Sequence, residues 1–134
     1  MIVADTNLFV YLYVRGQRTG QAEAVLARDS SWAAPLLWRS EFRSTLVGLV
    51  RQRDLTLADA IVLVAEAEQW MAGREYSVVS TQVLELAARS GCSAYDCEFV
   101  ALAQDLHTPL VTIDRQVLKA FSGVALSPET FLAR

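Results

Sequence analysis

Short apolar runs alternate along the chain with longer segments in which apolar residues recur every three or four positions. The short runs predict buried strands at 2–4, 31–34, 110–113 and 124–126, and residues 76–79 form either another short strand or a connection. The longer segments predict helices at 8–14, 21–28, 36–51, 57–71, 81–89, 95–106 and 115–121, followed by a helical turn that begins at 127–129. This alternation predicts an α/β fold with three layers, α/β/α, around a short and mainly parallel central sheet.

Only short turns separate these segments, without a linker, a repeat or a low-complexity stretch. A chain of 134 residues suits one domain, so we expect a single domain over residues 1–134. Thr6 or Asn7 is expected to cap the first helix, and Pro35 to end the second strand.

Two aspartates follow buried strands directly. Asp5 comes after the apolar residues 2–4, and Asp114 comes after the run 110–113. Ligands of open α/β sheets bind beyond the carboxyl ends of the strands, so these carboxylates converge if the two strands are neighbours. Either aspartate could instead only cap the helix that follows it.

A third acid, Asp96, lies in the predicted helix 95–106. At about 100° per residue it projects from the flank of an apolar arc formed by Tyr95, Phe99, Leu102 and Leu106. A carboxylate on an inward flank needs a hydrogen bond, an ion pair or a metal. Glu98 and Asp105 are expected on the opposite side, in water. The alternative for Asp96 is a first-turn acid favoured by the helix dipole.

Glu41, in the predicted helix 36–51, has a similar setting. Its neighbours on the helix surface include three small residues that leave room for a ligand, Ser44, Thr45 and Gly48. The alternative is a half-exposed glutamate that pairs with Arg39 or Arg43.

Four converging carboxylates without a companion His or Cys would favour a hard cation. Oxygen-only ligands suit Mg²⁺ or Mn²⁺. Such a site activates a water molecule and stabilises charge on a phosphate, so no protein nucleophile is needed. The only histidine, His107, lies far from Ser40, Ser44 and Thr112 in the sequence, which argues against a Ser-His-acid triad. No phosphate-binding glycine loop is present.

Composition narrows the picture only a little. Apolar residues make up 53% of the chain, charged residues 20%, and the net charge is −3 with a pI near 5.1. This balance argues mildly against a protein that coats nucleic acid, although a metal-binding acid cluster must itself be negative. Cys92 and Cys97 fit no zinc pattern and suggest a reducing compartment. No apolar run approaches the ~20 residues of a membrane span, so we expect a soluble, cytoplasmic protein.

In combination, these blocks resemble the PIN-domain family over the whole chain. The opening Ile2-Val3-Ala4-Asp5-Thr6-Asn7 is similar to the apolar strand and Asp-Thr/Ser-Asn/Ser start of that family. Glu41 matches the position of its second acid. The last two acids are matched, in order and spacing, by Ala94-Tyr95-Asp96, Ala101-Leu102-Ala103 and Pro109-Leu110-Val111-Thr112-Ile113-Asp114.

The compact size resembles, within that family, the VapC-type toxin ribonucleases of toxin–antitoxin pairs. The resemblance implies a Mg²⁺- or Mn²⁺-dependent endoribonuclease that cleaves RNA, often as a homodimer, and is held inactive by a cognate antitoxin protein. It implies an acidic, metal-binding site made of Asp5, Glu41, Asp96 and Asp114. Asn7 and Thr112 would be supporting polar residues. Cys97 and Glu98 depart from the family, which usually has small residues there.

Two other functions are open to the sequence. A phosphatase of the haloacid-dehalogenase type would use Asp5 as nucleophile, but it needs a second Asp where this chain has Asn7. A PIN-fold module that binds a partner without cutting is the other, and the intact set of four acids argues against it.

Overall fold

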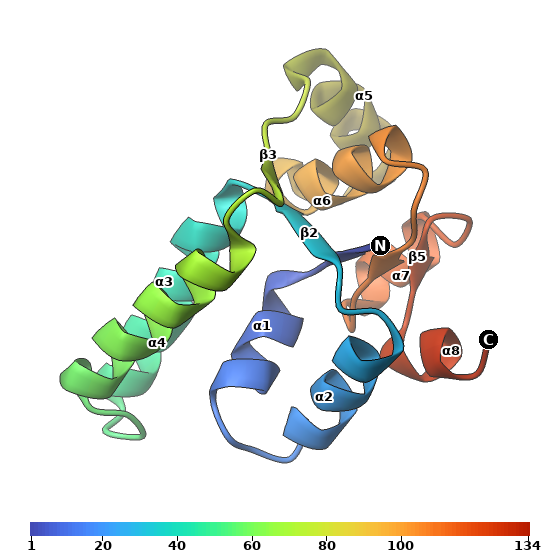
Figure 1. Cartoon of the computed structure of the whole chain (residues 1–134). Coiled ribbons are helices and arrows are strands. Elements are labelled where there is room, and N and C mark those ends of the chain that lie inside the picture. Colours follow the sequence, from blue (N-terminus) through green and yellow to red (C-terminus); the bar gives the residue numbers. More distant parts are fainter.

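The computed structural model describes residues 1–134 and centres on a five-stranded parallel sheet (Figure 1). Its strands are β1 (Ile2–Ala4), β2 (Trp32–Pro35), β3 (Glu75–Tyr76), β4 (Leu110–Val111) and β5 (Ala125–Leu126). They lie in the order β3-β2-β1-β4-β5, and every neighbouring pair is parallel. The first strand of the chain is therefore the central one, between β2 and β4.

Helices cover both faces of this sheet. The eight helices are α1 (Thr6–Tyr13), α2 (Thr19–Arg28), α3 (Leu37–Arg51), α4 (Leu57–Met71), α5 (Ser80–Ser90), α6 (Ala94–Asp105), α7 (Arg115–Ala120) and α8 (Pro128–Leu132). α6 packs on β1, β2 and β4, with α5 beside it, and α1 packs on the other face next to α2. α3 and α4 form a hairpin that extends to one side (Figure 1). The predicted three-layer α/β/α fold is confirmed. None of the helices has both the length and the apolar character that crossing a membrane requires.

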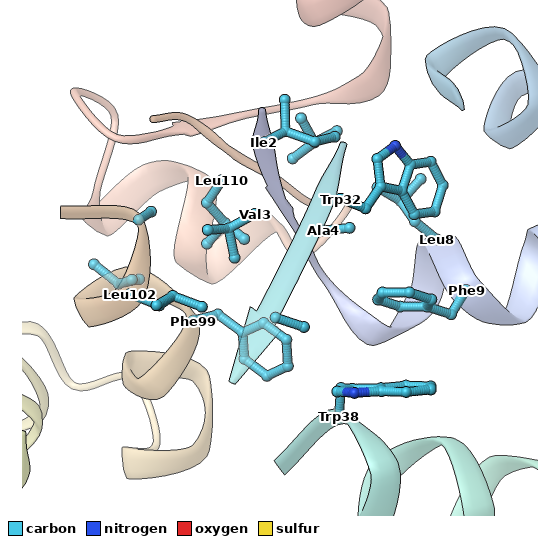
Figure 2. Close-up of a cluster of buried hydrophobic side chains, with 14 of the residues drawn as sticks. Ile2, Val3, Ala4, Leu8, Phe9, Trp32, Trp38, Phe99, Leu102 and Leu110 are labelled. Carbon is cyan, nitrogen blue, oxygen red and sulfur yellow. The ribbon is translucent and has the colours of Figure 1, made fainter. Parts of the chain in front are cut away.

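Two apolar layers hold the sheet between its helices. Val3 and Leu110 pack toward α6, where Phe99 and Leu102 lie (Figure 2). An aromatic cluster fills the other side, and in it the Phe9 ring stacks on Trp38 at a centroid distance of 4.8 Å. Because β1 is completely covered by both layers, the backbone that leads into Asp5 is fixed by packing.

A charged network joins α3, α4 and β3. Arg39 on α3 donates two hydrogen bonds to the Glu75 carboxylate of β3, at 2.6 and 2.8 Å, and one to Glu68 of α4 at 3.0 Å. The Trp38 indole donates a further bond to Glu75 at 2.7 Å. These hydrogen bonds, above all those from Arg39, lower the pKa of Glu75. The network fixes the first turns of α3 against the edge of the sheet.

Several element boundaries differ from the sequence prediction. α1 begins at Thr6 and its N-cap is Asp5, not Thr6 or Asn7 as predicted. Pro35 ends β2 as expected, but as the last residue of the strand, so that β2 covers 32–35 and not 31–34. The uncertain stretch 76–79 contributes only Tyr76 to a strand, together with Glu75. These shifts of one or two residues leave the topology unchanged.

Candidate active site

Two carboxylates meet at the carboxyl edge of the sheet because β1 and β4 are neighbours. Ala4 is in register with Val111, so Asp5 and Thr112 follow at the same edge. The buried Thr112 hydroxyl donates to Asp5 Oδ2 at 2.5 Å and accepts a bond from the Asp114 backbone N–H at 3.0 Å. Thr112 thus joins the two aspartates that the strand ends place there.

Both aspartates also cap helices. Asp5 Oδ1 accepts a hydrogen bond from the Thr6 N–H at 2.8 Å, and Asp114 Oδ1 accepts one from the Val117 N–H at 3.0 Å. Capping was the alternative to a site role for each residue, but the two roles use different oxygens. Asp114 Oδ2 makes no hydrogen bond within the chain and stays available to a ligand.

Glu41 reaches the same edge from the second turn of α3. The Thr6 hydroxyl donates to Glu41 Oε1 at 2.7 Å. Neither Arg39 nor Arg43 pairs with Glu41, because both lie against Glu68 and Arg39 also holds Glu75. The alternative of an ordinary ion pair is therefore wrong.

Asp96 completes the group from the first turn of α6. Ser93 caps this helix, with its hydroxyl 3.0 Å from the Asp96 N–H, and leaves the Asp96 carboxylate without a hydrogen bond in the chain. The side chain is half-buried. Its charge acts on both Asp5 and Glu41, so the four acids predicted from the sequence lie in one neighbourhood.

Burial and the charges of neighbouring acids raise the pKa of two members of this group, Asp5 and Glu41. Desolvation raises the pKa of Asp5, and the charges of Asp96 and Asp114 raise it further, against the hydrogen bonds from Thr112 and Thr6. Desolvation also raises the pKa of Glu41, with smaller contributions from Asp5, Asp96 and Glu98. No Arg or Lys forms an ion pair with any of the four acids. The site therefore concentrates negative charge that the chain itself does not neutralise.

The donor set fits a hydrated divalent cation. Every candidate ligand atom is a carboxylate oxygen, and several carry no hydrogen bond in the chain, among them both oxygens of Asp96. No three His, Cys, Asp or Glu side chains lie close enough together to hold one ion as direct ligands. Mg²⁺ usually keeps several of its waters and uses one or two carboxylates, so this open arrangement suits it.

The side-chain directions predicted from 100° per residue in α6 were wrong at two positions. Tyr95 was placed with the apolar arc that faces the core, but its side chain is 63% exposed. Glu98 was placed in water, but it is half-buried beside Val78, Val83 and Leu84, and desolvation raises its pKa. Asp105 is exposed, as predicted. Helical periodicity gives the direction of a side chain. It does not show whether a neighbouring helix or the sheet extends far enough to cover that side chain.

The two residues predicted to support the site, Thr112 and Asn7, differ in their hydrogen bonds. Thr112 makes the bridging contacts described above, whereas Asn7 is half-buried in the first turn of α1 and its side chain makes no hydrogen bond within the chain. Thr6 was not singled out as a site residue, although it holds Glu41. A hydroxyl directly after the first aspartate was the available signal, but its partner lies 35 positions away.

With this geometry in hand, comparison with known proteins identifies the family. A profile of the PIN domain matches residues 2–123 and so spans the sheet from β1 through β4 and all four acids. The chain belongs to the PIN domain family. The resemblance inferred from the sequence is thereby confirmed.

Relatives and solved structures point the same way. The chain is 27% identical over 126 residues to Ribonuclease VapC3 of Pyrobaculum aerophilum, covering 92% of this chain and 96% of that protein. It matches a chain in the crystal structure of FitAcB from Neisseria gonorrhoeae with a TM-score of 0.72 at 22% identity, covering 96% and 99% of the two chains. A chain of a toxin–antitoxin complex from Klebsiella pneumoniae matches with a TM-score of 0.68 at 18% identity, covering 96% and 98%. The two solved chains share the fold of this protein over nearly their whole length.

Proposed function

We propose that this PIN domain is a metal-dependent endoribonuclease with Asp5, Glu41, Asp96 and Asp114 as its acidic site. The observation that carries the proposal is the group of four carboxylates, without a cationic partner, at the carboxyl edge of the sheet. The relative named Ribonuclease VapC3, similar over nearly its whole length, supports the choice of RNA as substrate.

The residues of the chain have distinct parts in this reaction. The group of four carboxylates would attract a hydrated Mg²⁺ or Mn²⁺, with at most two of them as direct ligands, and the bound ion would activate a water molecule and stabilise the charge that develops on the phosphate. Thr112 fixes the Asp5 side chain through its hydroxyl and the Asp114 backbone through its oxygen. Thr6 orients Glu41 in the same way. No step needs a nucleophilic side chain.

The metal requirement is tested by cleavage of a labelled, unstructured oligoribonucleotide. We expect cutting in Mg²⁺ or Mn²⁺, none in EDTA, and recovery when the divalent ion is added back. The Asp5→Asn protein, purified in parallel, controls for contaminating ribonuclease. Undiminished cutting in EDTA that Asp5→Asn abolishes would refute the metal mechanism and retain the nuclease.

We further propose that the protein is the toxin of a toxin–antitoxin pair. The similarity to VapC3 and to a chain of a toxin–antitoxin complex supports this role. Induction of the chain alone should slow growth, and co-expression of the small protein encoded beside it should restore growth and copurify. The Asp5→Asn chain is the matched control and should be harmless. Abundant folded protein that leaves growth unchanged would refute the toxin role, whereas the nuclease assay stands apart. The expected homodimer stays a prediction, which light scattering can test.

A further inference from the structure

One aromatic side chain of this protein is left out of its core. The sequence has 5 Phe, 3 Trp and 4 Tyr, and among them only Tyr95 belongs to the exposed large side chains, at 63% exposure. Its ring takes part in none of the aromatic pairs or cation–π contacts of the molecule. The Tyr95 ring therefore makes no aromatic or cation–π contact within the molecule and is free to meet a ligand.

The position of Tyr95 follows from where the sheet ends. Tyr95 and Phe99 are four residues apart and so share one face of α6. Phe99 is only 2% exposed and lies at the end of β2 (Figure 2). α6 leads into the parallel strand β4, so it runs against the strands and its first turn lies at their carboxyl edge. Tyr95, one turn before Phe99, therefore extends past the sheet, on the side where the acids lie.

Two carboxylates flank this ring on the helix. Asp96 lies about 100° to one side of Tyr95 and Glu98 about 60° to the other. Asp96 is one of the four acids and directly follows Tyr95 in α6, so the ring adjoins the acidic site. Tyr95 consequently lies over the rim of the acidic site, beside the place where a phosphate would react.

We propose that Tyr95 is a substrate-binding residue whose ring stacks on an unpaired RNA base next to the scissile phosphate. This inference rests on the proposed ribonuclease function and assigns a substrate-binding residue to it. The rim is negative, and an aromatic ring attracts a base through its π-face without adding charge. Stacking of this kind tolerates any base but requires that the base is not paired in a duplex. Tyr95 would therefore contact its substrate only where the base beside the cleavage point is unpaired.

The test compares Tyr95→Phe, which keeps the ring, with Tyr95→Leu, which keeps only apolar bulk. With Mn²⁺ and an unstructured oligoribonucleotide, we expect Tyr95→Leu to raise KM by roughly 5- to 150-fold, the range that base–aromatic stacking contributes, with little change in kcat. Tyr95→Phe should stay within about twofold of wild type in KM. Val62→Ala, which trims an exposed apolar side chain on α4 (53% exposed), is the matched control and should leave KM unchanged.

An abasic substrate separates stacking from a structural role. Removing the base next to the cleaved bond should raise KM for the wild-type protein by a similar factor and should add nothing in Tyr95→Leu. Annealing a complementary strand over this site should abolish cleavage. An unchanged KM for Tyr95→Leu, with the wild type active, would overturn the inference and leave the proposed ribonuclease function standing. A wild-type chain that neither cuts nor binds RNA would overturn the proposed function as well.

Discussion

Helix α3 borders two groups of carboxylates, and the two groups differ in whether a cation accompanies them. Near its start, Arg39 neutralises Glu75 and Glu68 through three hydrogen bonds. One half-turn later, Glu41 joins Asp5 and Asp96, and no cation accompanies them. The pKa of Glu75 is lowered and that of Glu41 is raised. Acids of the first kind hold the fold together, whereas acids of the second kind place uncompensated charge where a ligand can use it.

Removing one charge from the uncompensated group should have the largest effect on catalysis. We expect Asp96→Asn to slow RNA cleavage by about 10²-fold or more, because the amide weakens binding of the cation that stabilises the transition state. Glu68→Gln, in the compensated network, and Glu98→Gln, at the border of the site, should stay within a few-fold of wild type. Single-turnover cleavage measures this, with thermal melts as a folding control. Equal losses in Asp96→Asn and Glu98→Gln would mean that the wrong face of α6 has been assigned to the site.

The two regions should respond to neutralisation with opposite changes in stability. Glu75→Gln removes charged hydrogen bonds to Arg39 and Trp38 and should lower the free energy of unfolding by about 1–2 kcal/mol. Asp5→Asn relieves repulsion from Asp96 and Asp114 and should leave the melting temperature unchanged or higher. Urea unfolding of both variants, measured without divalent ions, shows whether each substitution raises or lowers the free energy of unfolding. A destabilised Asp5→Asn protein would show that the hydrogen bonds of the carboxylate outweigh its repulsion.

Removing the Thr112 hydroxyl, which bridges Asp5 and Asp114, should have a smaller effect on stability and cleavage. Thr112→Val keeps the shape of the side chain but leaves Asp5 Oδ2 and the Asp114 N–H without their partner. The expected loss is about 1 kcal/mol of stability, with cleavage slowed by roughly tenfold or less. Thr112→Ser, which retains the hydroxyl, is the matched control. Cleavage that Thr112→Ser fails to preserve would indicate that the methyl group, not the bridge, matters.

The smallest effect is the pH dependence of stability without metal. The raised pKa values of Asp5 and Glu41 mean that the folded chain binds protons before the unfolded chain does, so their contribution improves as pH falls toward the ordinary value of about 4. The lowered pKa of Glu75 acts in reverse, since its stabilisation is present above that value and is lost as pH falls through the folded pKa. Thermal melts from about pH 7 to 3 check both effects. In Asp5→Asn, the gain in stability that comes from the raised pKa should be smaller as pH falls. In Glu75→Gln, the loss in stability that comes from the lowered pKa should be smaller. Identical curves for the two variants would contradict this assignment.

The sequence could predict the acidic group because its signals are local. Asp5 and Asp114 each follow an apolar strand, and parallel strands bring their ends to one edge whatever the exact boundaries. Periodicity also placed Asp96 on the inward flank of its helix. The backbone pattern therefore singled out two aspartates more than a hundred positions apart, and their convergence depended on β1 and β4 being neighbours, which the structure shows.

The contacts that neutralise or expose a side chain were not predictable in this way. β3 has only two residues and no apolar alternation, so nothing marked Glu75 as the partner of Arg39. The exposure of Tyr95 and the partial burial of Glu98 depend on where β2 ends and how α5 packs on α6. Both are properties of the folded molecule and not of the local sequence. Helical geometry fixes directions, and tertiary structure decides what lies in those directions.

The position of β1 in the centre of the sheet also sets the order in which the site can form. Asp5 is synthesised before the rest of the site, and its hydrogen-bond partner Thr112 follows 107 positions later. Until β4 has emerged and paired with β1, a growing chain carries one half of the site without the other. Contacts of such long range form late in folding. If cleavage requires the complete acid group, a ribosome that makes this protein is exposed to its activity only when most of the domain has been translated.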